Sequence, residues 1–180
     1  GNFIELGERF SIPPILARII RNRGVVGEEA MQKYLYGTRE DLYAPGLLKN
    51  MTKATSLMRQ YIEQGKKIRI IGDYDVDGIC ATYILMKGLS ALGADVDYAI
   101  PHRIIDGYGI NEHLIDAAHE AGREVLITCD NGIAAGSQIA YARSLGMSVI
   151  VTDHHEVPYE EGPEGIRYIL PEADAIVDPK

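Results

Sequence analysis

Apolar residues in the second part of the chain form short strand-like runs that alternate with longer helix-like segments. Strands are expected at five places, near residues 68–72, 95–100, 124–129, 148–152 and 174–177. Helices near residues 78–92, 111–121 and 132–145 are expected to separate the first four strands. Gly93, Gly122 and Gly146 stand where these helices should end. The alternation predicts an α/β fold with a mostly parallel open sheet and helices on both faces.

The first third of the chain has a helical pattern instead. Pro13 and Pro14 precede an apolar segment over residues 15–20, as is typical of a helix start. Further helices are expected at about 28–36 and 52–64, the last with apolar residues on one face. We therefore expect an N-terminal helical segment over residues 1–66 and a catalytic α/β domain over 67–180. Residues 156–166, rich in Glu, Gly and Pro, are expected to form a loop.

Polar residues follow four of the expected strands at the point where each strand ends. They are Asp73, Asp75 and Asp77 after the first strand, His102 and Arg103 after the second, Asp130 and Asn131 after the third, and Asp153, His154 and His155 after the fourth. Because the carboxyl ends of parallel strands meet at one edge of a sheet, these side chains are expected to share one crevice.

The acidic residues of this crevice predict a metal site. Carboxylates about 5 Å apart repel each other by roughly 3 kcal/mol per pair at an effective dielectric near 20, and a divalent cation removes that cost. Aspartate oxygen combined with imidazole nitrogen suits Mn, Fe, Zn or Co better than Ca. One residue of the pair His154 and His155 is expected to bind the metal, and the other to orient a phosphate or transfer a proton.

Arg103 is the candidate phosphate ligand, because its planar guanidinium can bind two phosphate oxygens at once. It precedes a glycine-containing loop, Asp106–Asn111, in which backbone could approach a substrate closely. The two cysteines, Cys80 and Cys129, show no metal-binding spacing and are expected to be reduced thiols.

Composition and charge are those of an ordinary globular protein with an acidic second part. The chain has 180 residues, 46% of them hydrophobic, and a net charge of −8. Residues 1–66 carry ten Lys or Arg against seven Asp or Glu, whereas residues 67–180 carry eight against nineteen. The sequence has no run of about 18 apolar residues and no signal-peptide pattern, so we expect a cytoplasmic protein without a membrane partner.

A class of α/β enzymes and a class of α/β signalling domains share part of this pattern. Asp75 and Asp77 resemble the first motif of haloacid-dehalogenase-type phosphatases, in which the first aspartate is a nucleophile. Those enzymes place a Ser or Thr, a Lys and an acidic pair after later strands, where this chain has Asp130 and an Asp-His-His turn. Receiver-like signalling domains have no use for paired histidines. Both interpretations are therefore less favoured than a metal site.

The motifs together resemble those of the DHH phosphoesterases. The resemblance is carried by Gly-Asp-Tyr-Asp-Val-Asp-Gly at 72–78, Asp-Asn-Gly at 130–132 and Asp-His-His at 153–155. Within that family the chain is most similar to the RecJ-type single-stranded-DNA-specific exonucleases, which also have a comparable loop at 101–109 and a similar N-terminal stretch at 12–18.

The resemblance implies an exonuclease that removes 5′-mononucleotides from single-stranded DNA in the 5′ to 3′ direction during DNA repair and recombination. It implies Mn²⁺ as cofactor, with Mg²⁺ as the alternative and up to two ions. The implied metal ligands are Asp75, Asp77, Asp130 and His154, with Asp130 as the bridge between the ions. Asp73 and His155 would be catalytic residues, and Arg103 would hold a phosphate. Single-stranded DNA and a single-stranded-DNA-binding protein are the implied partners.

One departure from the family pattern is visible. The fourth family motif, which contains another metal-binding aspartate, lies beyond residue 180, and Asp178 comes too early to be assigned to it. We therefore expect an incomplete catalytic domain from the N-terminal part of a longer nuclease. A DHH phosphoesterase for small substrates (oligoribonucleotides, cyclic dinucleotides or pyrophosphate) and a non-catalytic DHH-like scaffold remain the alternatives.

Overall fold

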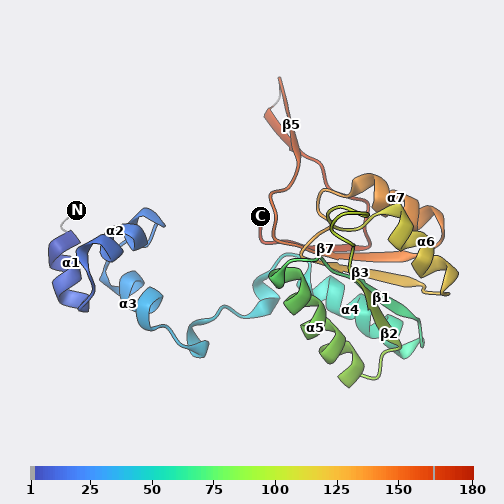
Figure 1. Ribbon diagram of the computed structural model, residues 1–180, viewed down its shortest axis with the longest axis horizontal. Helices are drawn as coiled ribbons and strands as arrows, with labels where there is room; N and C mark the ends of the chain where they lie inside the picture. Colours follow the sequence, from blue (N-terminus) through green and yellow to red (C-terminus); the bar gives the residue numbers. More distant parts are fainter. Residues whose placement is uncertain (1–2, 164) are drawn as a thin grey trace. The chain divides into compact units, whose positions relative to one another are not determined.

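The computed structural model describes residues 3–163 and 165–180 (Figure 1). The chain divides into two compact units, Gly1–Ala44 and Pro45–Lys180. No helix in the described part of the chain is long and apolar enough to cross a membrane.

The first unit is a small group of helices: α1 (Phe3–Phe10), α2 (Pro14–Asn22), α3 (Glu28–Tyr36) and the 3-10 helix η1 (Arg39–Asp41). Phe10, Ile20 and Met31 form its buried core. The hydroxyl of Tyr36 donates a hydrogen bond to the carbonyl of Phe10 over 3.0 Å, which joins α3 to the end of α1. The two helices expected here are confirmed, whereas α1 was not anticipated.

The second unit is built on a five-stranded parallel sheet. Its strands are β1 (Ile68–Ile71), β2 (Val96–Ala99), β3 (Val125–Cys129), β4 (Ser148–Thr152) and β7 (Ala175–Val177). They lie in the order β2-β1-β3-β4-β7, and all neighbouring pairs are parallel. The predicted parallel sheet is confirmed.

Helices cover both faces of this sheet. They are α4 (Met51–Glu63), α5 (Val76–Ala91), α6 (Glu112–Glu120) and α7 (Gly136–Ser144), with the 3-10 helix η2 (Pro45–Leu47) before α4. On one face Met58 of α4 and Leu89 of α5 pack against Ile70 and Ile127 of the sheet. On the other face α6 and α7 pack against residues such as Leu126. Successive side chains of a strand point to opposite faces of the sheet, so each strand contributes residues to both cores.

Helix α4 belongs to the second compact unit, although we expected it within the N-terminal helical segment. Ala54, Met58 and Tyr61 bury one face of α4 in the core of the sheet. Before α4, the side-chain amide of Asn50 donates a hydrogen bond to the carbonyl of Ile176 in β7 over 2.9 Å. The division into domains at residues 66 and 67 stays a prediction, and the compact units divide at 44 and 45.

Residues expected to form a loop contain a two-stranded antiparallel hairpin instead, β5 (Tyr159–Gly162) and β6 (Gly165–Tyr168). Its strands are exposed along their whole length, and Figure 1 shows the hairpin projecting from the sheet. Tyr159 and Tyr168 pack edge to face with ring centroids 6.4 Å apart. Arg167 and Glu160 form an ion pair of 2.8 Å. These cross-strand pairs stabilise the hairpin. They cannot be recognised from the Glu, Gly and Pro content that predicted a loop.

Candidate metal centre

The acidic turn after β1 forms the start of α5. Asp75 is the N-cap residue, and its Oδ1 accepts a hydrogen bond of 2.9 Å from the backbone N–H of Gly78. A side chain at Gly78 would collide with the backbone of Asp73, because an added Cβ would lie 2.7 Å from its nitrogen. The glycine therefore lets the helix start lie directly against Asp73, which is 1% exposed.

Asp130, directly after β3, has a left-handed backbone with φ +62°. Its carbonyl accepts a hydrogen bond of 2.7 Å from the hydroxyl of Tyr108. The next residue, Asn131, is fully buried; its amide donates to the carbonyls of Ile71 and Cys129. The side chains of Tyr108, from another segment, and of the neighbouring Asn131 thus stabilise a backbone conformation that aspartate adopts only rarely.

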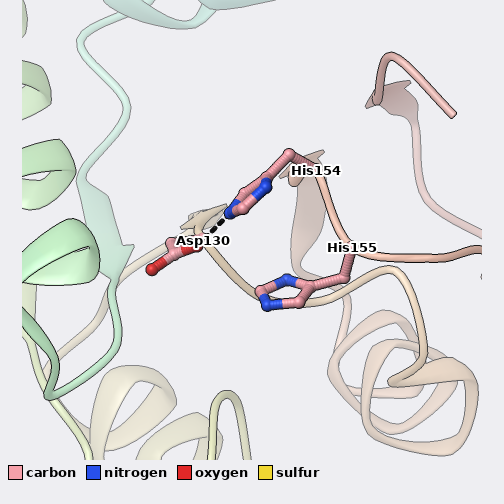
Figure 2. A group of neighbouring side chains, drawn as sticks. All are labelled: Asp130, His154 and His155. Atoms are coloured by element: carbon pink, nitrogen blue, oxygen red, sulfur yellow. Dashed lines mark hydrogen bonds and ion pairs between the residues drawn. The ribbon is translucent and has the colours of Figure 1, made fainter. Parts of the chain in front are cut away.

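The two histidines after β4 converge on Asp130, as Figure 2 shows. Nε2 of His154 lies 2.8 Å from Oδ1 of Asp130 and 3.6 Å from Oδ2 of Asp77. Asp130, His154 and His155 each offer one ligand atom within 4.8 Å of the others. The oxygen and nitrogen donors of this group fit a divalent transition metal.

The buried carboxylate of Asp153 orients the two histidines. Its side chain is 1% exposed, and its Oδ1 lies 2.6 Å from Nδ1 of His155. Its Oδ2 accepts a hydrogen bond of 2.9 Å from the backbone N–H of Ile133. A buried carboxylate on the far nitrogen of a histidine is the usual outer partner of a metal-binding imidazole. The sequence places Asp153 in the motif, but only the structure shows that it points inward.

The charges of the site favour a cation. Burial raises the pKa of Asp130, the hydrogen bond from His154 lowers it, and the charges of Asp77 and Asp75 raise it. Both carboxylate oxygens of Asp73 are buried without a hydrogen-bond partner among the described residues. A hydrogen bond from Gly78 lowers the pKa of Asp75 and keeps it ionised. The residues present therefore fit a bound divalent ion, which would neutralise a group of like charges, of which Asp73 and Asp130 are buried.

Arg103 lies outside the group of Asp130 and the histidines. Its guanidinium carbon lies 4.4 Å from the centre of the Tyr74 ring. Its charge contributes to lowering the pKa of Asp75, after the larger effect of the Gly78 N–H. The preceding residue, His102, donates its backbone N–H to Asp106 over 2.7 Å, which closes the loop that carries Arg103.

Two residues at this edge were not assigned a role from the sequence. Tyr108 lies 3.2 Å from Nε2 of His155 as well as bonding to Asp130. Burial raises its pKa, and the charges of Asp153 and Asp130 raise it further, so its hydroxyl stays protonated. Asp178 follows β7, and one of its oxygens is buried without a partner among the described residues. The sequence signal that could have identified Asp178 is its position directly after the fifth parallel strand.

The structure thus brings most of the predicted residues to one edge. Asp130 and both histidines form a group, with Asp77 beside His154, Asp75 at the helix start and Asp73 beneath it. Arg103 stands beside Tyr74. Which of these residues bind a metal stays a prediction.

The fold and this edge are those of an N-terminal domain of the DHH family. The profile of the DHH family, N-terminal domain, matches residues 67–180. The chain belongs to this family.

RecJ proteins are among the relatives that this chain resembles. The chain is 40% identical over 176 residues to the single-stranded-DNA-specific exonuclease RecJ of Bacillus subtilis strain 168, covering 98% of this chain and 21% of that protein. A crystal structure of exonuclease RecJ bound to manganese is 37% identical with a TM-score of 0.65, over 77% of this chain and 33% of that one. RecJ of Thermus thermophilus in complex with Mn²⁺ is 32% identical with a TM-score of 0.61, over 83% of this chain and 21% of that one. The chain thus spans a third or less of each of these proteins.

Proposed function

We propose that this chain provides the DHH part of a metal-dependent phosphodiesterase, a single-stranded-DNA-specific exonuclease that releases 5′-mononucleotides in the 5′ to 3′ direction during repair and recombination. The observation that carries the proposal is the convergence of Asp130, His154 and His155 at the carboxyl edge of the sheet. Similarity to RecJ over 98% of the chain supports the substrate class.

The metal ligands in this proposal are Asp75, Asp77, Asp130 and His154, which would hold up to two Mn²⁺ ions. Manganese is present in the solved RecJ structures similar to this chain. A bound divalent ion lowers the pKa of water and polarises a phosphoryl oxygen, which is the chemistry that phosphodiester hydrolysis needs. Asp130 would be the shared ligand, because it lies between His154 and the acidic turn of α5.

The remaining residues handle protons and the phosphate. Asp153 occupies Nδ1 of His155, which leaves Nε2 as the nitrogen that exchanges a proton with the reacting groups. Across the described residues both buried oxygens of Asp73 lack a hydrogen-bond partner, so they would be available to accept a hydrogen bond or a proton from the attacking water. Arg103 binds a phosphate of the strand, since a guanidinium pairs with two phosphate oxygens.

The test is hydrolysis by the unchanged chain and by Asp130→Asn, each with Mn²⁺ or Mg²⁺. The substrates are labelled single-stranded DNA, double-stranded DNA, short oligoribonucleotides and a cyclic dinucleotide, and the product measured is the labelled mononucleotide. Asp116→Asn, an exposed acid of α6 that bonds to Tyr141, is the matched control. We expect release from single-stranded DNA, abolished in Asp130→Asn and retained in Asp116→Asn.

Other outcomes distinguish the alternatives. Hydrolysis confined to oligoribonucleotides or cyclic dinucleotides would replace the DNA exonuclease with a small-substrate phosphoesterase. Mn²⁺ binding without hydrolysis of any substrate would contradict catalysis by this chain and favour a binding scaffold.

A further inference from the structure

The side chain of Arg103 lies against an aromatic ring. It is exposed, and its guanidinium carbon lies 4.4 Å from the centre of the Tyr74 ring, within the range of a cation–π contact. Across the described residues, no carboxylate comes within ion-pair distance of it, although Asp75 is close enough for the Arg103 charge to affect its pKa. The guanidinium is thus held beside the acidic turn without being paired to it.

This arrangement matters because a free arginine beside several carboxylates would pair with one of them. A bidentate pair with Asp75 would occupy the N–H groups that bind a phosphate. Stacking on a ring uses the face of the guanidinium and leaves its N–H edge available. It also restricts a side chain that otherwise has many rotamers, so less entropy is lost when a phosphate binds.

Tyr74 is itself held in place by contacts within the site. Its ring packs edge to face on Tyr108, with centroids 6.4 Å apart and planes at 86°. Tyr108 packs in turn on the ring of His155, with centroids 5.7 Å apart, and donates its hydroxyl to the carbonyl of Asp130. A continuous row of contacts therefore links the guanidinium to the backbone of the metal centre.

We infer that Tyr74 is a positioning residue, whose ring holds Arg103 beside the metal centre with its N–H groups presented to a phosphate of the DNA strand. This role rests on the proposed function. The competing role for an aromatic residue at a nucleic-acid site is direct stacking on a base, which is insensitive to the phosphate charge.

The experiment measures binding of the oligonucleotide dT10 to the Mn²⁺-loaded chain at several salt concentrations. The variants are Tyr74→Leu, Tyr74→Phe, Arg103→Met and the double variant of Tyr74→Leu with Arg103→Met. Tyr43→Leu is the matched control, because Tyr43 makes a cation–π contact with Lys33 in the other compact unit.

We expect Arg103→Met to reduce the slope of log affinity against log salt by about 0.7, the value for one phosphate contact on a single strand. Tyr74→Leu should lower the slope in the same direction and weaken binding about two- to fivefold. The double variant should bind no more weakly than Arg103→Met alone. Tyr74→Phe, which keeps the ring, and Tyr43→Leu should both behave like the unchanged chain.

A measurement without DNA makes the test independent of activity. In the unchanged chain, the δ-methylene protons of Arg103 should show an upfield ring-current shift in the NMR spectrum, which Tyr74→Leu removes and Tyr74→Phe retains. Mn²⁺ affinity of Tyr74→Leu, measured by electron paramagnetic resonance, should stay within about twofold, because Tyr74 supplies no ligand atom.

Three results would contradict the inference. An unchanged salt slope in Tyr74→Leu, with a loss that adds to that of Arg103→Met, would assign Tyr74 to base stacking. Absence of the ring-current shift would show that the two side chains are not stacked in solution. Failure of the unchanged chain to bind dT10 would contradict the proposed function and this role with it, whereas binding with a full slope in Tyr74→Leu would contradict only the role of Tyr74.

Discussion

The two halves of the metal centre differ in how firmly the protein holds them. On the side of β3 and β4, the side chains of Asp130 and Asp153 are 6% and 1% exposed, and hydrogen bonds fix both the left-handed backbone of Asp130 and the ring of His155. On the side of α5, Asp77 is 68% exposed and approaches His154 only to 3.6 Å. The side of β3 and β4 is therefore preorganised, whereas the carboxylate on the side of α5 can change its position.

This difference indicates how the site would use a cation. The buried carboxylates of Asp130 and Asp153 fix where the ion lies, because these side chains cannot turn away without leaving buried polar atoms unpaired. Exposed carboxylates on a helix start then close around the charge with little structural cost. Substitutions on the two sides of the centre separate these two contributions.

Asp130→Asn should produce the largest loss. Asparagine tolerates the left-handed backbone, so the change removes the charge and one ligand atom while the fold is retained. We expect Mn²⁺ affinity, measured by isothermal titration calorimetry, to fall by more than about 100-fold. This is more than the loss of a residue that only hydrogen-bonds to a metal ligand typically costs. Asp77→Asn should cost about tenfold, since an exposed ligand is more easily replaced by water. Equal losses in the two variants would contradict the distinction between the halves.

Asp153→Asn tests the outer partner of the preorganised half. It should weaken Mn²⁺ binding by about 10- to 100-fold, because the carboxylate that accepts the backbone N–H of the ligand His154 loses its charge. Asp174→Asn is the matched control: Asp174 also accepts from a backbone N–H, that of Val149, and pairs with Arg143 away from the metal ligands. A loss of affinity in Asp174→Asn of similar size would show that general destabilisation explains both variants.

Gly78→Ala tests the packing of the acidic turn. The added methyl group would press on the backbone of Asp73, so the free energy of unfolding in urea should fall by about 1–3 kcal/mol. Gly88→Ala in the same helix meets no atom within 4 Å and should raise it, by up to about 1 kcal/mol. Two variants with the same sign would contradict the close approach of α5 to Asp73.

The smallest effect concerns pH. The hydrogen bond that Nδ1 of His155 donates to Asp153 raises the pKa of His155 above its ordinary value of 6.5. In the metal-free protein, the stability from this pair is fully present below pH 6.5 and is lost as pH rises through the raised pKa. A protonated His155 beside the ion would repel it, so Mn²⁺ affinity should rise as this imidazole loses its proton over the same interval. His155→Gln should flatten the pH dependence of both the stability and the Mn²⁺ affinity. If both stay unchanged in this variant, His155 is not their source.

The sheet and its functional edge could be predicted because the signals are local. The apolar runs that form β1, β3 and β4 are regular and bounded by polar turns, and parallel strands necessarily gather the residues that follow them. The spacing of Asp73, Asp75 and Asp77 and the pair His154 and His155 indicated a metal site without any structure.

Other features depend on contacts between distant residues and could not be predicted. The strand order, the packing of α4 on the sheet and the hairpin of β5 and β6 are set by tertiary contacts rather than by local pattern. Asp153 and Asp77 look alike in the sequence, yet one is buried beneath His155 and the other is exposed. The contact of Arg103 with Tyr74 joins the ends of two different strands.

The most direct test of the metal centre is to look for histidine nitrogen on bound manganese. Electron spin-echo envelope modulation of the Mn²⁺-loaded chain reports ¹⁴N coordinated to the ion. If His154 binds the ion, a ¹⁴N signal should be lost in His154→Gln and retained when the exposed His119 of α6 is changed in the same way. Manganese that binds with no ¹⁴N signal, or with a signal unaffected by His154→Gln, would contradict a centre built on His154.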